Sequence, residues 1–157
     1  MKIPKALARR IQKRLYFLSY DSCYADSFTS GLLDHNLEKV ACWQMAVDII
    51  YRLVKGGLMQ NLSINEENSE ETERKNFSYI QQLAQSNPFS ENTDENIVWW
   101  IMDFYRTDFA HELVDRYNIT GDPEEALNED FMEEVERCFE ANGVGWCETP
   151  LIPIRAS

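Results

Sequence analysis

Apolar residues recur along the chain at the three- and four-residue intervals of helices, separated by short polar stretches. The first such pattern predicts a helix over residues 4–19, with an apolar stripe made by Leu7, Ala8, Ile11, Leu15 and Leu18. A second pattern runs from Leu37 to Val54, with Asp34 or Asn36 as its cap and Gly56 and Gly57 as its stop. A third helix is predicted through Phe77, Ile80, Leu83 and Ala84, after a polar loop.

The most apolar stretch lies between residues 94 and 117. At about 100° per residue its apolar side chains point nearly all the way round, which predicts a central helix packed by several neighbours. Pro88 sets the boundary before it, Thr93 or Asp94 can cap it, and Thr107 is the expected place for a bend.

A helical region is expected over residues 122–141, with Asp122 as its cap and Pro123 at its first position. Its apolar residues Phe131, Val135 and Phe139 fall on about a third of the circumference. Residues 144–157 contain two prolines and predict an extended tail anchored by Trp146. The fold class predicted from these patterns is all-α: one domain over residues 1–157, a bundle of about five helices with an extended C-terminal tail.

Composition supports a folded body, because 44% of the 157 residues are hydrophobic and 12% are aromatic. The four cysteines form no C-x-x-C pair, which indicates free thiols rather than a zinc or redox site. No apolar run approaches the roughly 20 residues of a membrane span. We therefore expect a cytoplasmic protein that does not bind a membrane.

Charge is distributed unevenly along the chain. The net charge is −12, yet residues 1–20 carry six bases and no acid, whereas residues 66–148 carry twenty-two acids and five bases. Residues 122–140 alone hold nine carboxylates, with Arg137 as the only base among them. Such a surface repels nucleic acid and attracts cationic surfaces, so direct nucleic-acid binding is not expected.

Three interpretations compete for these acids: a solvated helix face, a metal or acid–base site, and a docking surface for a basic partner. Basic residues four positions away, which normally relieve an acidic face, are almost absent from this segment. This absence favours the docking surface. The residues predicted to contact the partner are Glu124, Glu125, Glu129, Asp130, Glu133, Glu134, Glu136, Glu140 and Trp146.

The alternative is a small helical metalloenzyme that uses Asp108, His111, Glu112 and Asp115, which fall within about 100° of one another on a helix. A di-iron bundle needs Glu-x-x-His from two helices and two further glutamates, and the only other histidine is His35. The chain also lacks a G-x-S-x-G elbow and a glycine-rich phosphate loop. We therefore expect no catalytic residue, no metal and no cofactor.

The stretch "IVWWIMDFYRTDFAHELVDRYNITGDPEEALNEDFMEEVERCFEANGVGW" resembles the immunity proteins of bacterial contact-dependent growth inhibition and related polymorphic toxin systems; the resemblance covers residues 86–148. It implies a non-enzymatic protein that binds the toxin domain of its own strain, often a cationic nuclease, and neutralises it. It carries over no residue roles. Whether a toxin-associated host protein joins the complex is left open, as is an acidic adaptor or nucleic-acid-mimicking inhibitor of another basic protein.

Overall fold

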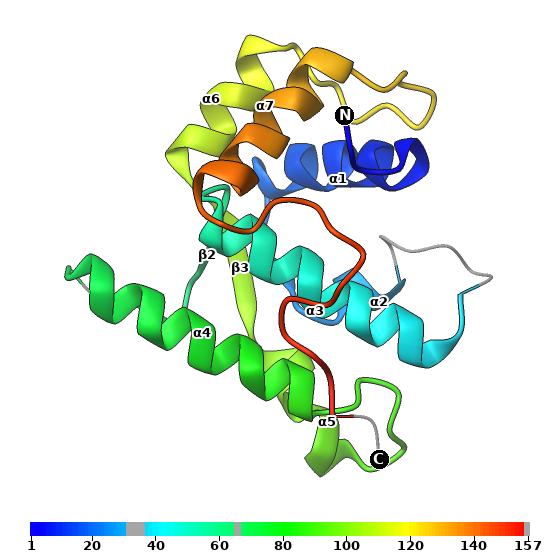
Figure 1. Ribbon diagram of the computed structural model, residues 1–157, viewed down its shortest axis with the longest axis vertical. Helices are drawn as coiled ribbons and strands as arrows, with labels where there is room; N and C mark the ends of the chain where they lie inside the picture. The colour runs from blue at the N-terminus through cyan, green and yellow to red at the C-terminus, as the bar shows by residue number, and fades with distance from the viewer. Residues whose placement is uncertain (31–36, 65–66, 156–157) are drawn as a thin grey trace.

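The computed structural model describes residues 1–30, 37–64 and 67–155. Asp34, His35 and Asn36 lie outside these described residues. Within them the chain forms seven helices and three short strands, shown in Figure 1. In chain order they are α1 Lys5–Leu18, β1 Cys23–Tyr24, α2 Ser27–Ser30, α3 Lys39–Lys55, β2 Met59–Asn61, α4 Ser69–Gln85, α5 Thr93–Ile101, β3 Asp103–Arg106, α6 Asp108–Arg116 and α7 Glu129–Ala141.

The predicted all-α bundle of about five helices is wrong, because the described residues form seven helices and the three strands form an antiparallel sheet in the order β1-β3-β2. Phe104 of β3 is paired with Cys23 of β1 on one side and with Asn61 of β2 on the other. The sheet thus ties together three segments that are far apart in the sequence.

The helix predicted over residues 94–117 is divided into α5, β3 and α6. Met102 takes an extended conformation, with φ −77° and ψ 111°, and this ends α5. Met102 and Phe104 are buried while Asp103 between them is not, which is the alternation of a strand. At the expected bend, the Thr107 side chain accepts a hydrogen bond from Ala110 N at 3.1 Å and caps a new helix.

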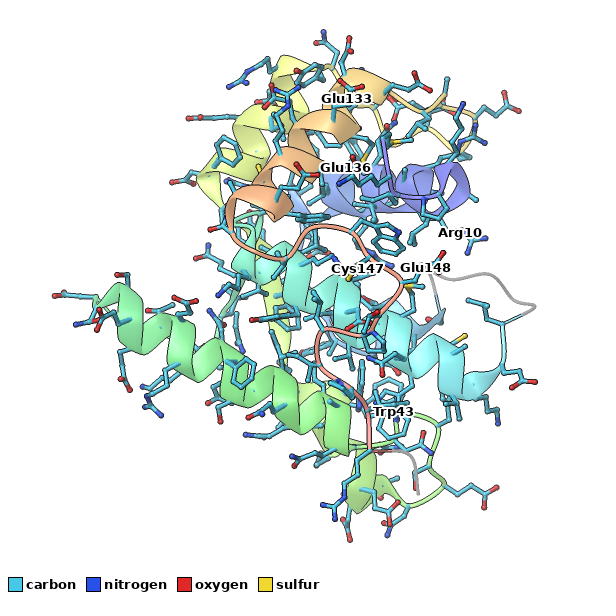
Figure 2. The ribbon with its side chains drawn as sticks, in the orientation of Figure 1. Arg10, Trp43, Glu133, Glu136, Cys147 and Glu148 are labelled. Atoms are coloured by element: carbon cyan, nitrogen blue, oxygen red, sulfur yellow. The ribbon has the colours of Figure 1, made fainter. Side chains whose placement is uncertain are left out.

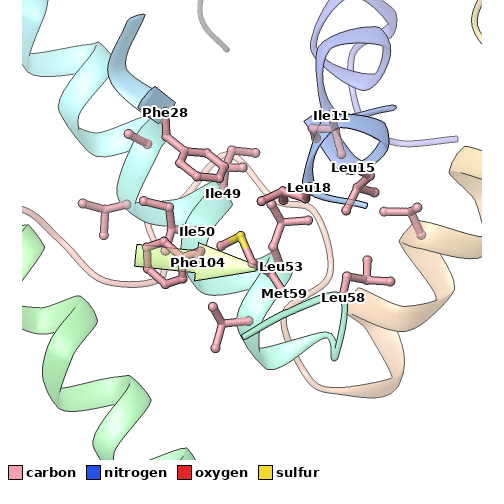
Figure 3. Packing of buried hydrophobic residues seen from close by; sticks show 14 of the residues in the cluster. Ile11, Leu15, Leu18, Phe28, Ile49, Ile50, Leu53, Leu58, Met59 and Phe104 are labelled. Carbon is pink, nitrogen blue, oxygen red and sulfur yellow. The ribbon is translucent and has the colours of Figure 1, made fainter. Parts of the chain in front are cut away.

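The centre of the molecule is α3 rather than the segment 94–117. Helix α3 packs against α2, α4, α7 and β2. Its residues Ile49, Ile50 and Leu53 are fully buried and meet Phe28, Phe104 and Leu58 in the core shown in Figure 3. The second predicted helix is therefore the hub of the fold, and its stop at Gly56 and Gly57 is confirmed, with Gly57 at φ +78°.

The first predicted helix is also confirmed. Ala8, Ile11, Leu15 and Leu18 are buried along α1, and Leu7 packs against the core from its edge. This stripe docks α1 against α6, α7 and β3. The basic helix therefore lies beside the acidic segment of the chain, so opposite charges meet within one fold.

The start predicted for the helix over residues 122–141 is wrong. Residues 122–128 form a turn and loop, in which Glu125 N donates to Asp122 O at 3.0 Å, and α7 begins only at Glu129. The cap of α7 is Asn128, whose side chain accepts from Phe131 N. Asn68 and Asn92 cap α4 and α5 in the same way.

The C-terminal segment packs on α3 as an extended strap, without helix or strand between residues 144 and 155. In Figure 1 it crosses the face of α3. Three α3 side chains spaced one helical turn apart hold it there. Gln44 donates to Ile152 O at 2.9 Å, Asp48 accepts from Leu151 N at 3.1 Å, and Arg52 donates to Val144 O at 3.0 Å. Burial raises the pKa of Asp48 and lowers that of Arg52.

No helix in the described part of the chain combines the length and the apolar character that crossing a membrane requires.

Candidate protein-binding surface

Helix α7 presents a row of carboxylates to solvent. Phe131, Val135 and Phe139 are fully buried on its inner side. The exposed residues on the outer side are Glu129, Asp130, Glu133, Arg137 and Glu140. Glu124 is exposed on the loop that leads into the helix. Most of the predicted partner-binding acids therefore lie on an accessible face.

Glu136 does not belong to that face. Only 9% of it is exposed, and its Oε1 accepts hydrogen bonds from Lys2 N at 2.8 Å and Ile3 N at 2.7 Å. Figure 2 shows Glu136 and Glu133 on the same helix, of which only Glu133 is exposed. The carboxylate of Glu136 anchors the N-terminus of the chain to α7, so we do not include it in the binding surface.

Glu125 also binds backbone groups within the fold. Its carboxylate accepts from Thr120 N at 2.7 Å, Thr120 Oγ1 at 2.9 Å, Gly121 N at 3.3 Å and Gln12 Nε2 at 3.2 Å. Partial burial works against the charged form, but these hydrogen bonds outweigh it and lower the pKa of Glu125. Glu125 therefore holds the loop 120–128 against α1.

Glu134 is half-buried between two helices. It accepts from Tyr117 Oη, at the end of α6, at 3.3 Å and pairs with Arg137 on α7 at 3.4 Å. The Tyr117 ring packs edge-on against Phe131, with ring centroids 5.9 Å apart. These contacts join α6 to α7, so that the exposed acids of the two helices lie at one end of the molecule, as Figure 1 shows.

The α7 acids do have basic neighbours, which come from the start of the chain. The inference that these acids lack basic neighbours, drawn from the scarcity of bases within residues 122–140, is therefore wrong. Lys2 pairs with Glu140 and Lys5 pairs with Glu129, each at 3.5 Å, while Arg137 reaches Glu133 at 4.0 Å. All of these side chains are about half exposed or more, so solvent screens the pairs strongly. A partner's lysines and arginines could displace them at little cost.

The side chains considered as metal ligands make other contacts or face solvent. His111 Nε2 lies 3.4 Å from Asp115 Oδ2, Arg106 pairs with Asp108 at 3.2 Å, and Glu112 is exposed. Across the described ranges, no three His, Cys, Asp or Glu side chains are grouped so that they could hold a metal ion. Nothing in this geometry favours the metalloenzyme interpretation.

Together, α6, α7 and the loop between them form what we call the acidic end of the molecule. Its exposed carboxylates belong to Asp108, Glu112, Asp115, Asp122, Glu124, Glu129, Asp130, Glu133 and Glu140. Arg116 and Arg137 are the only bases in residues 108–140, all of which the structure describes. The residues considered separately as a metal face and as a docking face thus contribute to one strongly negative region.

Exposed aromatic side chains that were not predicted from the sequence border the acidic end. Tyr20, which is 63% exposed, packs edge-on against His111 of α6, with ring centroids 6.2 Å apart. Phe17 is 48% exposed and Phe109 41%. Their exposure could have been inferred from the sequence, because Phe17 and Tyr20 lie outside the apolar stripe of the first helix.

The predicted aromatic contact Trp146 is half-buried, with the Arg52 guanidinium 4.8 Å from its ring centroid. Arg52 also donates to Val144 O and Gly145 O, on the two residues that precede this tryptophan. Trp146 therefore fixes the C-terminal segment to α3, as the sequence predicted, while its part in binding a partner stays a prediction.

A wide cleft of about 950 Å³ lies elsewhere, between α4 and the ends of α3 and α7. It is lined by aromatic and charged residues, among them Tyr51, Lys55, Glu73 and Phe77. The Lys55 ammonium pairs with Glu73 at 2.5 Å. Among the described residues, no histidine or cysteine is part of this lining.

In comparisons with protein-family models, with curated proteins and with solved structures, nothing matches this chain.

Proposed function

We propose that this protein is a non-enzymatic immunity protein that binds a basic toxin domain through its acidic end and so neutralises it. The observation that carries the proposal is the concentration of nine exposed carboxylates on α6, α7 and the loop between them, against Arg116 and Arg137 in the same segments and the exposed Lys2 and Lys5 beside them. A nuclease holds phosphate with lysine and arginine, and a rigid acidic surface competes for the same groups.

Charge alone gives rapid association and weak rim contacts, so a tight complex also needs apolar anchors. Tyr20 and Phe109 are exposed beside the acids of α6 and supply aromatic surface there. Their position gives the acidic end the combination expected of a specific interface: a few aromatic side chains surrounded by charge. The proposal therefore assigns affinity to the aromatics and association rate to the carboxylates.

If the proposal holds, the gene directly upstream encodes a large secreted toxin. The test uses the C-terminal domain of the protein encoded by that upstream gene, here called the cognate domain. Cells that express the cognate domain should survive only when this chain is co-expressed, and the two should co-purify in a one-to-one complex. Replacing Tyr20 and Phe109 with alanine should weaken that complex by tenfold or more, the loss of about 1.4 kcal/mol expected when anchors are truncated.

A matched control replaces Leu62, another half-exposed apolar residue, with alanine; it lies outside the acidic end and should leave binding unchanged. If the wild-type chain neither protects the cells nor forms a detectable complex with the cognate domain, neutralisation by binding is overturned. Binding to an unrelated host enzyme, with no toxin gene upstream, would instead support the acidic adaptor or nucleic-acid mimic that the charge pattern also fits.

A further inference from the structure

Helix α5 presents an apolar face to solvent. Ile97 is 54% exposed, Trp100 55% and Ile101 62%. Trp100 and Ile101 follow Ile97 by three and four residues, so the three side chains lie on one side of the helix. The opposite side carries the buried Asn96 and Trp99. We call Ile97, Trp100 and Ile101 the α5 patch. Single exposed apolar residues are common, but three large ones gathered on a nine-residue helix indicate an interaction surface.

The helix that carries the patch is fixed to the body by its inner side chains. Trp99 Nε1 donates to Ser86 O at 2.6 Å, and Asn96 Nδ2 donates to Ser90 O at 2.9 Å. Asn92 caps the first turn by accepting from Asp94 N at 3.0 Å. A face held in this way is ordered before any partner arrives, so binding costs little conformational entropy.

The α5 patch is separate from the acidic end. Figure 1 shows α5 at the opposite end of the long axis from α6 and α7. Of the two adjacent tryptophans, Trp99 is fully buried in the core while Trp100 is exposed. Tryptophan is among the residues that most often dominate binding energy, so Trp100 is the natural centre of this surface.

The charges near the α5 patch indicate the charge that a partner must carry. Residues 76–105 contain four acids, Glu91, Asp94, Glu95 and Asp103, and no lysine or arginine. Nearby cations come from other segments: Lys39 lies over the Phe89 ring, 5.9 Å from its centroid, and Arg155 N donates to Ala84 O. A second copy of this chain would bring its own acids against Asp94 and Glu91, which is unfavourable.

We infer that the α5 patch is a docking surface for a segment of another protein that presents apolar side chains flanked by lysine or arginine. The inference is independent of the proposed function, because it concerns other residues at the other end of the molecule. The apolar side chains would cover Trp100 and its neighbours, while the flanking cations would approach Asp94 and Glu91.

The test measures binding of a short synthetic amphipathic helix built only of leucine and lysine to the full chain. Its dissociation constant is determined by calorimetry, and the indole N–H signals of the four tryptophans are followed by two-dimensional NMR. We expect the Trp100 signal to shift more than those of Trp43 and Trp99, which are buried. Trp100→Ser should weaken binding at least about tenfold.

Matched variants and peptides separate this surface from the acidic end. Phe109→Ser removes an exposed aromatic residue of the acidic end, which can also attract a basic peptide, and should weaken binding less than Trp100→Ser does. A peptide with glutamate in place of lysine should bind at least about tenfold more weakly, because it meets like charge. Both variants are compared with the wild-type chain by thermal unfolding, and Trp100→Phe, which keeps an aromatic ring, should restore part of the affinity.

Three results would overturn the inference. Weakening by Phe109→Ser but not by Trp100→Ser would place the peptide on the acidic end. Equal binding of the glutamate peptide would remove the selection for basic partners. Self-association of the chain in sedimentation experiments that Trp100→Ser abolishes would identify a second copy as the occupant. None of these results bears on protection by the acidic end, which is tested separately with the cognate domain.

Discussion

Individual carboxylates of the acidic end have different tasks. Glu136 accepts hydrogen bonds from backbone N–H groups of the distant N-terminus, and Glu125 from those of Thr120 and Gly121 in its own loop, whereas Glu129 and Glu133 face solvent. The first two stabilise the fold, and the others remain accessible to a partner. Charge-reversal experiments on binding therefore need to leave Glu125 and Glu136 in place.

Glu125→Gln should make the stability of the protein less dependent on pH. The pKa of Glu125 is lowered in the fold, so its stabilising contribution is present at neutral pH and is lost as pH falls through that pKa. We expect Glu125→Gln to lose about 1 kcal/mol at pH 7, a modest value because the carboxylate is partly exposed. Urea unfolding should show the difference closing below about pH 4.

The control is Glu124→Gln, a neighbouring carboxylate that is exposed. It should leave the unfolding curve nearly unchanged at both pH values. An equal loss for the two variants at pH 7 would contradict the role assigned to the hydrogen bonds of Glu125.

Gly121→Ala should destabilise the protein. Gly121 has φ +68°, and a Cβ there would lie 2.1 Å from Cδ1 of Tyr16. Strain in the backbone and displacement of the ring together should cost about 2–3 kcal/mol in urea unfolding. Gly143→Ala provides the matched control, because Gly143 has φ +74° but open space around it. Equal losses for the two would show that the contact with Tyr16 is unimportant.

Helices and strands were predictable to different degrees. The stripes of α1 and α3 extend over three or more turns, so their periodicity is unambiguous. Strands of two to four residues are too short to show a period, and their pairing depends on contacts between distant segments. Asn68, Asn92 and Asn128 are the caps at the starts of α4, α5 and α7, and these local signals were not among the predicted caps.

The strap along α3 could be recognised only in part. Prolines and alternating apolar residues predicted an extended segment, but its partners Gln44, Asp48 and Arg52 lie about a hundred residues earlier. Their spacing of four residues is common on helices and does not by itself indicate binding of a segment. The structure is needed to show that this row faces the tail.

Arg52→Met should loosen the strap. The change keeps the apolar stem of the side chain but leaves Val144 O and Gly145 O without their donor, at a cost of roughly 2–3 kcal/mol. Urea unfolding measures this loss, and tryptophan fluorescence reports on Trp146, whose ring lies against the guanidinium. Arg137→Met, on the exposed face of α7, should have almost no effect on either signal.

A result in which Arg137→Met and Arg52→Met are equally destabilising would contradict the strap as described. Unchanged fluorescence in Arg52→Met, with stability lost, would show that Trp146 is held by other contacts.

At the scale of the whole molecule, the charges and apolar surfaces are segregated. The acidic end contains α6 and α7, the basic helix α1 lies beside it, and the α5 patch lies at the far end. The sequence predicted the negative charge, since net charge depends on composition alone. It could not predict which acids are accessible, or that Trp100 is exposed while Trp99 is buried, because both depend on packing.

The central claim is that the acidic end binds a basic partner. Its most direct test is the association rate of the cognate domain, measured by stopped flow at low and high salt. Reversing Glu129, Asp130 and Glu133 to lysine should slow association by at least about tenfold at low salt and much less at high salt. Reversing Glu38, Glu67 and Glu70, which are exposed elsewhere, changes the net charge equally and should slow it far less. Equal slowing by both triple variants, or by neither, would contradict the account.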